Sequence, residues 1–105
     1  MIMRIWRTRV DEGRAAEYER FAAEESLPMF SGQPGFLGLL FGRAGTECAV
    51  VTLWEDDAAA ESLEASPNYR ETVARIGATG FLQGASTVER MNVHGGQLPG
   101  GWRME

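Results

Sequence analysis

The sequence predicts an α+β domain with one antiparallel sheet, and three observations lead to this class. Segments with the period-two pattern of strands are interleaved with two segments of helical spacing. Their order is strand, helix, strand, strand, helix, strand. The chain has 105 residues, of which 44% are hydrophobic and 24% charged, as expected for one globular domain. Two right-handed β-α-β units in one sheet give a ferredoxin-like βαββαβ protomer with its helices on one face.

The N-terminal segments predict a strand followed by a helix. Residues 1–10 place β-branched and aromatic residues between arginines, which favours a strand whose Trp6 and Arg7 face opposite ways. Residues 11–28 have apolar side chains at helical spacing. Because Pro28 has no backbone N–H, we expect this helix to end just before it or to change direction there.

A hairpin and a divided helix are predicted next. Residues 36–43 and 47–55 read as strands, and the glycines at positions 38 and 42 leave room for a helix or a ligand to lie close. Residues 56–77 form a helix in two pieces, with Ser66 as the N-cap of the second. Residues 85–94 alternate as the last strand. The predicted division is a folded domain over residues 1–94 and a flexible, glycine-rich tail over residues 95–105.

Composition excludes several classes of function. A formal net charge of −5 argues against nucleic-acid binding, and no apolar run approaches the roughly 20 residues of a membrane helix. We therefore expect a cytoplasmic location. All ten basic residues are arginine, which excludes a lysine Schiff base. Cys48 and His94 are the only residues of their kinds, so one chain cannot build the usual zinc site, and we predict neither a metal nor a cofactor.

The sheet face without helices predicts a partner. Its apolar members would be Leu37, Leu39 and Phe41, or Val51 and Leu53. An uncovered apolar face of this size favours association, and a homodimer that buries about 1,600 Å² is the usual outcome.

Several short motifs resemble those of one family. The segments RIWR, EGRAAEYERF, QPGFLG, VTLWEDDAA, SPNYRETV and VERMNV resemble, in order and spacing, the antibiotic-biosynthesis-monooxygenase-like family over residues 3–93. This resemblance implies two protomers joined into a dimeric α/β barrel, with a pocket between sheet and helices. Some members are similar to cofactor-independent oxygenases of electron-rich aromatic polyketides, others degrade haem, and many have no known reaction.

The haem-degrading branch is not matched. The resemblance places its asparagine at Trp6 and its helical tryptophan and histidine at Leu63 and Val73. Without a histidine on that helix the chain offers no evident axial ligand, so we do not expect haem degradation.

The oxygenase branch is matched by Trp54, at the end of the third predicted strand. This tryptophan either stacks on a flat aromatic substrate or pins the second helix to the sheet as a core residue. The polar partners found near it in oxygenase members are absent, since Val50 lies four residues before it and Ala60 six after. Of the three acids that follow, Asp56 is interpreted as a helix N-cap rather than a metal ligand.

Other polar residues each have two interpretations. Arg7 either stabilises an oxyanion or pairs with Glu89 or Glu55 across the sheet. His94 is either a general base or an exposed residue at a strand end. Tyr69 either places a phenol at the pocket mouth or packs with its hydroxyl at the surface.

The predicted function is cofactor-free oxygenation of an aromatic or quinol-type small molecule. Substrate deprotonation and electron transfer to dioxygen would proceed in an apolar pocket. The alternative is a homodimer of the same fold that binds a small ligand, or is purely structural, without catalysis. The predicted catalytic residues are His94 and Arg7, and the predicted pocket residues are Trp54, Tyr69, Trp6 and Gly38.

Overall fold

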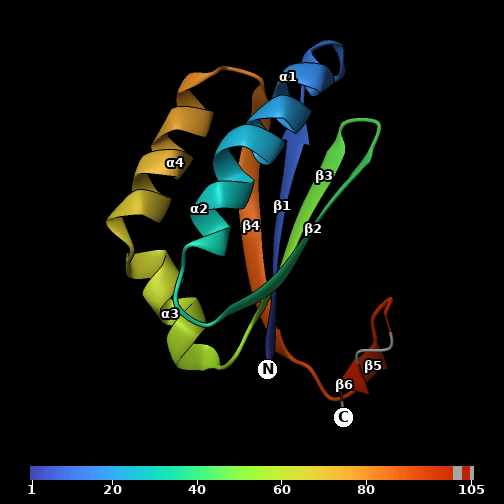
Figure 1. Cartoon of the computed structure of the whole chain (residues 1–105). Coiled ribbons are helices and arrows are strands. Elements are labelled where there is room, and N and C mark those ends of the chain that lie inside the picture. Colours follow the sequence, from blue (N-terminus) through green and yellow to red (C-terminus); the bar gives the residue numbers. More distant parts are fainter. Residues whose placement is uncertain (101–102, 105) are drawn as a thin grey trace.

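Four strands form one antiparallel sheet in the computed structural model, which describes residues 1–100 and the backbone of residues 103 and 104. The sheet order is β2-β3-β1-β4, and helices cover one of its faces (Figure 1). The predicted ferredoxin-like α+β fold is confirmed. The strands are β1 (Ile2–Val10), β2 (Phe36–Ala44), β3 (Glu47–Trp54) and β4 (Leu82–Asn92).

The first helical segment is longer and less regular than predicted. It consists of a 3₁₀ turn η1 (Glu12–Arg14), α1 (Ala15–Phe21), a π-helical stretch η2 (Ala22–Ser26) and α2 (Leu27–Ser31). The expected end at Pro28 is wrong, because Pro28 lies in the first turn of α2, where a missing N–H is tolerated.

The second helical segment is divided as predicted, into α3 (Asp57–Ala65) and α4 (Pro67–Ala78). The Asp56 carboxylate accepts a hydrogen bond of 2.8 Å from the backbone N–H of Ala59 and caps α3. The Ser66 hydroxyl likewise accepts from the backbone N–H of Tyr69 and caps α4. Both assignments as N-caps are confirmed.

A β-bulge between Phe36 and Gly38 decides which side chains of β2 face the helices. After the bulge, Gly38 pairs with Leu53 and Leu40 pairs with Val51 on the open face. Leu39 and Phe41 point instead to the helices, where Leu39 packs on the core and Phe41 lines a pocket. Placing Leu39 and Phe41 on the open face was therefore wrong, and the alternative pair Val51 and Leu53 does lie there.

Gly35 permits a close approach between the turn before β2 and α3. Its φ is +77°, and a Cβ at this position would lie 2.5 Å from the Cβ of Ala59. Both the backbone conformation and the contact exclude a side chain. The turn is then tied to the end of β3 by a hydrogen bond from the Glu55 N–H to the Gly35 carbonyl.

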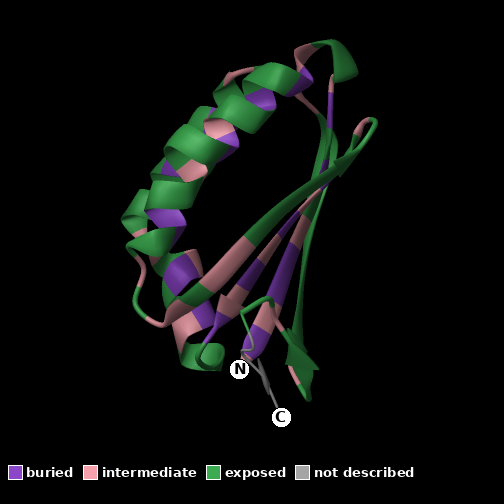
Figure 2. Ribbon diagram, turned by 45° about the vertical axis from the view of Figure 1, so that its right-hand side comes forward, coloured by how far each residue is buried: buried purple, intermediate pink, exposed green. Residues whose placement is uncertain are grey.

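The core has two parts, between the sheet and the helices. One surrounds Trp54 with Ile2, Met29, Phe30, Val50, Ala60 and Leu63, and the other surrounds Tyr18 with Val10, Ala15, Cys48, Ile76 and Phe81. Trp6 packs against both parts. Figure 2 shows the exposed residues of the helices on the side turned away from the sheet.

The last strand begins three residues earlier than predicted, at Leu82, and ends at Asn92. Beyond it, β5 (Gly96–Gln97) pairs antiparallel with β6 (Arg103–Met104). This pairing lies within the predicted tail, whose flexibility remains a prediction. Among the described residues, no helix is long and apolar enough to cross a membrane.

Removing the Asp56 carboxylate should destabilise the domain measurably. We expect Asp56→Ala to lower the free energy of unfolding by about 1 kcal/mol, because the first turn of α3 loses its cap. Urea unfolding monitored by circular dichroism provides the measurement. Glu61→Ala, at an exposed position in the same helix, is the control and should change little. Equal stability of the two variants would show that the cap contributes nothing.

Candidate functional site

A narrow, largely apolar pocket lies between the sheet and the helical layer. The cavity has a volume of about 40 Å³, which is enough for a few water molecules. Strands β1, β2 and β3 contribute its floor, and α1, η2, α2 and α4 its walls. The lining residues are Arg4, Trp6, Tyr18, Ala22, Ser26, Met29, Phe30, Phe41, Val50, Tyr69, Thr72, Val73 and Ile76.

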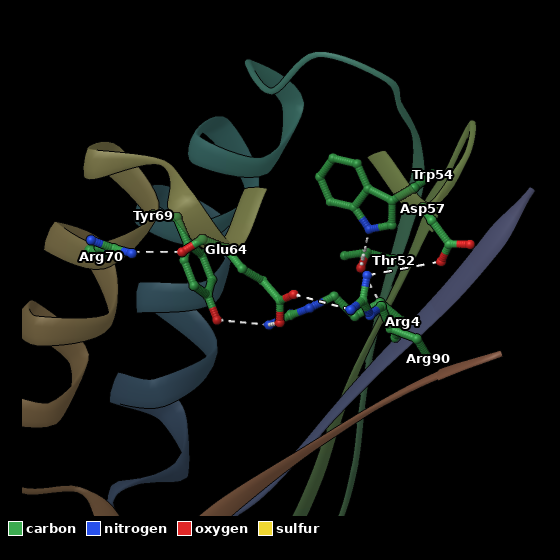
Figure 3. Close-up of polar contacts among 8 residues, drawn as sticks. All are labelled: Arg4, Thr52, Trp54, Asp57, Glu64, Tyr69, Arg70 and Arg90. Atoms are coloured by element: carbon green, nitrogen blue, oxygen red, sulfur yellow. Dashed lines mark hydrogen bonds and ion pairs between the residues drawn. The ribbon is translucent and has the colours of Figure 1, made fainter. Parts of the chain in front are cut away.

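Arg4 is the one charged residue among those that line the pocket. It is only 2% exposed, and its Nη2 donates a hydrogen bond of 2.8 Å to the Tyr69 hydroxyl (Figure 3). The guanidinium carbon lies 5.3 Å from the centroid of the Tyr69 ring, within cation–π range. The Nε atom of Arg4 is buried and has no hydrogen-bond partner. The lining of the pocket therefore includes a fixed positive charge.

Glu64 on α3 balances this charge from the edge of the site. Its carboxylate lies 3.5 Å from Arg4 Nη2 and 3.9 Å from Arg90 Nη2 (Figure 3). Arg4 and Arg90 are direct neighbours across β1 and β4, so two like charges lie side by side on the sheet. Glu64 offsets the repulsion between them, and its own side chain remains 37% exposed.

Tyr18 on α1 places a second phenol against the pocket. Its ring packs edge-on against Phe81, with centroids 6.0 Å apart, and its buried hydroxyl lies against the Cys48 thiol without forming a well-aligned hydrogen bond. Burial raises the pKa of the Tyr18 phenol far above its ordinary value, and the neighbouring Cys48 acts in the same direction. Burial also raises the pKa of the Cys48 thiol. Neither group is ionised at neutral pH, so neither is an activated nucleophile.

Trp54 lies in the core and outside the pocket. It is 0% exposed, and its indole N–H donates a hydrogen bond of 2.8 Å to the Thr52 hydroxyl (Figure 3). Its ring packs edge-on against Phe36. The contacts of Trp54 with Ala60 and Leu63 pin α3 to the sheet. This placement agrees with the core interpretation of Trp54.

The other predicted site residues divide between the pocket and the outside. Trp6 and Tyr69 line the pocket. Arg7 lies on the open sheet face, where it pairs with Glu89, one of the two partners considered for it. Gly38 is also on the open face, next to Leu53. His94 is exposed after the end of β4 and does not line the pocket.

Arg4 is the residue that the sequence analysis missed. A signal for it existed, because residues two apart on a strand share a face and Trp6 had already been assigned to the pocket. The alternation of MIMRIWRTRV therefore puts Arg4 beside Trp6. The burial of Arg4 was not predicted, because an arginine closed inside an apolar layer is rare.

Comparison with known proteins identifies the family. A family model described as antibiotic biosynthesis monooxygenase matches residues 1–75. The chain belongs to this family. No curated protein matches the sequence of this family member at a significant level.

Solved structures of similar proteins share the fold of this family member. One is a monooxygenase from the gene ActVA-Orf6 of Streptomyces coelicolor in complex with nanaomycin D, with a TM-score of 0.80, 20% identity, and coverage of 93% of this chain and 91% of that one. A mutant of SnoaB, a cofactor-independent oxygenase from Streptomyces nogalater, has a TM-score of 0.74 and 22% identity, and the match covers 93% of this chain and 96% of that one. NE2512 of Nitrosomonas europaea, a protein of unknown function, has a TM-score of 0.76 and 18% identity, and the match covers 95% of each chain. At these identities the likeness establishes the fold alone.

The described part of the chain offers no cluster of acidic, histidine or cysteine side chains suited to a metal ion. No three such residues come together among residues 1–100. The polar groups available for chemistry in the pocket are thus the Arg4 guanidinium and the phenols of Tyr18 and Tyr69, supported by the hydroxyls of Ser26 and Thr72.

The buried Tyr18 phenol should make the protein sensitive to alkaline pH. Because its pKa is raised in the folded state, the unfolded chain loses the proton first, near pH 10, and stability falls as the pH rises above that value. We expect Tyr18→Phe to reduce this loss without abolishing it, since Cys48 contributes with the same sign. Urea unfolding midpoints at about pH 8 and about pH 11 provide the measurement. An identical decline in both proteins would contradict the assignment.

Proposed function

We propose that the protein is a cofactor-independent monooxygenase of a flat, electron-rich aromatic or quinol-type small molecule. Family membership supports a monooxygenase role at the level of the family. The observation that carries the proposal for this chain is Arg4, a 2% exposed cation at the base of an apolar pocket. A fixed, desolvated positive charge stabilises an anion that forms beside it.

The reaction requires such an anion. Loss of a proton from a phenol or anthrone gives an electron-rich anion, and Arg4 favours this step by lowering the pKa of the bound substrate. The anion transfers one electron to dioxygen, and the substrate radical and superoxide combine into a peroxide anion. This anion takes up a proton, equivalent to the one that the substrate lost, and becomes a hydroperoxide. Loss of water from the hydroperoxide leaves a carbonyl, so that one oxygen atom enters the product and the other leaves as water.

The remaining lining residues would hold the substrate and exclude water from the anionic intermediate. Trp6, Val50 and Ile76 give the pocket apolar surfaces against which a ring system packs. Tyr69 holds the Arg4 guanidinium by its hydrogen bond, which fixes the direction of the charge. Exclusion of water strengthens the attraction between Arg4 and the anion and protects the carbanion from reprotonation.

A second candidate function is ligand binding without catalysis. It is favoured by the positions of His94 and Arg7, because neither predicted catalytic residue lines the pocket. No carboxylate or imidazole belongs to the lining of the pocket among the residues described, so a proton released there would pass to water. Turnover distinguishes the two candidates, since both predict binding.

Purified protein should oxidise at least one member of a panel of anthrones and hydroquinones under dioxygen, faster than buffer. We expect Arg4→Met to lower kcat/KM by about 100-fold, the usual cost of losing a group that stabilises an oxyanion. Arg4→Lys is a second variant that keeps the charge if Arg4→Met folds poorly. Oxygen uptake and product formation provide the measurement.

The matched control is Arg20→Met, an exposed arginine of α1, which should retain full activity. If no compound is oxidised faster with the protein than in buffer alone, the monooxygenase function is rejected and ligand binding without catalysis remains. Equal rates for Arg4→Met and Arg20→Met would remove Arg4 from the mechanism.

We further propose that two copies associate through the open sheet face. Met3, Val51 and Leu53 are half-buried there, next to Met91 and to Leu40, whose side chain is 67% exposed. These residues lie directly opposite one another on neighbouring strands, so they form one apolar area that crosses all four strands. An apolar area that spans a sheet favours burial against a second sheet.

A charge at the centre of this face should separate the copies. We expect the native protein to be a dimer in light scattering and Leu40→Glu to shift it towards the monomer, because the partner would have to bury an unpaired carboxylate. Leu27→Glu is the control, since Leu27 is also exposed, at 41%, but lies on α2. A native monomer at high concentration would refute the proposal.

A further inference from the structure

A second cavity adjoins the pocket at the edge of the sheet. It lies between α1, η2 and the edge strand β2, and its volume is about 180 Å³. Tyr18, Ala22 and Phe41 line both this outer cavity and the pocket, so the two spaces meet along these side chains. The residues that line the outer cavity alone are Glu19, Ala23, Gly42 and Arg43.

The two cavities differ in what they can hold. An apolar protein cavity of roughly 150 Å³ takes up a benzene molecule. The outer cavity exceeds this volume, whereas the pocket, at about 40 Å³, falls well below it. An organic ligand therefore fits the pocket only after one of the lining side chains has moved.

Phe41 is the lining side chain that stands between the two cavities at the end of the pocket floor. Val50 on β3 pairs directly with Trp6 on β1 and with Phe41 on β2, so the floor is one row across three strands. Trp6 and Val50 line the pocket and not the outer cavity. Phe41 ends the row on the edge strand, and it is 37% exposed. Its rotation needs no strand or helix to shift, and such side-chain rotations take picoseconds to nanoseconds.

A different opening would run between η2 and α4, beside the 44% exposed side chain of Val73. There the two helical walls are joined, because Arg75 on α4 donates a hydrogen bond of 2.7 Å to Glu25 on η2. The ion pair itself stabilises little at this exposed position. Parting the walls would nevertheless require packed helices to move together, which is a far slower motion than the rotation of one side chain.

The frame of the outer cavity is held in place beside Phe41. Arg43 donates hydrogen bonds of 3.2 Å and 3.0 Å to the Glu19 carboxylate on α1, and one of 2.8 Å to the Gly45 carbonyl. These bonds tie the end of β2 to the helical layer. Phe41 can therefore turn while the strand and the helix that flank it keep their positions.

We propose that ligands enter the pocket from the edge of the sheet, through the outer cavity, and that the Phe41 side chain is the gate between the two spaces. The proposal rests on the binding role of the pocket proposed above, but not on its reaction. With Phe41 turned aside, the pocket and the outer cavity form one continuous space. Ala23, a small exposed residue of η2, then sets the width of the entrance.

Access to Trp6 tests the gate without any substrate. Acrylamide, a small neutral quencher of tryptophan fluorescence, is the probe. A Trp102→Phe background leaves Trp6 and Trp54 as the only tryptophans. Trp54 is 0% exposed in the core, so changes in the Stern–Volmer quenching constant report on Trp6 in the pocket.

We expect Phe41→Ala to raise this quenching constant, because the side chain that closes the end of the floor is gone. Ala23→Phe should lower it by filling the entrance, and it tests the gate from the opposite side if Phe41→Ala folds poorly. Arg75→Met is the matched control, since it removes the ion pair across the other opening, and it should leave the constant unchanged. Circular dichroism verifies that each variant is folded.

Two results would overturn the proposal. One is a quenching constant that stays the same in folded Phe41→Ala or in Ala23→Phe. The other is a rise in Arg75→Met that equals or exceeds the rise in Phe41→Ala, which would place the entrance between η2 and α4. A functioning gate without oxidation of any compound would reject the monooxygenase alone, whereas turnover with unchanged access to Trp6 in Phe41→Ala would reject the gate alone.

Discussion

A guanidinium closed inside an apolar layer is the constraint on which the rest of the site depends. Burying the charge of Arg4 is costly unless it is paired and hydrogen-bonded. The partners come from two other elements, Glu64 on α3 and Tyr69 on α4. Ser66 ends α3 and caps α4, so the charge on β1 has one partner in each piece of the divided helix. The same charge is the group of the pocket on which the proposed chemistry depends.

The sheet has two faces with different roles, and the bulge in β2 decides which side chains of that strand lie on each face. Before the bulge, Phe36 packs against Trp54 on the helical side. After it, Phe41 still contributes to the pocket, while Gly38 and Leu40 face outward. One inserted residue thus preserves the apolar lining of the pocket and leaves an apolar outer face that favours a second copy. The site and the proposed assembly depend on the same irregularity in β2.

Local signals predicted most of the fold correctly. Asp56 and Ser66 were identified as N-caps because a short oxygen-bearing side chain before a helical pattern has few other roles. Pro28 misled the prediction, because a proline ends a helix only where its missing N–H would have been used, and in the first turn of α2 it is not. The face of Leu39 was also mispredicted, since alternation over a strand holds only until a bulge interrupts it.

The candidate site was predicted less completely, for a related reason. Trp6 and Tyr69 were predicted correctly, and both line the pocket. Trp6 is an aromatic residue on the helical face of the first strand, and Tyr69 is an aromatic residue in the first turn of a helix. His94, Arg7 and Gly38 were chosen for their chemistry or their lack of a side chain, and the structure places all three outside the pocket. The rarity of histidine in the chain made His94 conspicuous, but rarity does not bring a residue to a pocket.

The sequence by itself determined the order of elements, the helix caps and the division of β1 into two faces, because these depend on neighbours within a few residues. Tertiary structure alone decided that Arg4 is buried and half-paired, that Trp54 is sealed in the core and that Tyr18 reaches the pocket. Each of these depends on contacts between residues far apart in the chain, such as the 65 positions that separate Arg4 from Tyr69. Such contacts are set by how the helical layer lies on the sheet, and no local pattern encodes them.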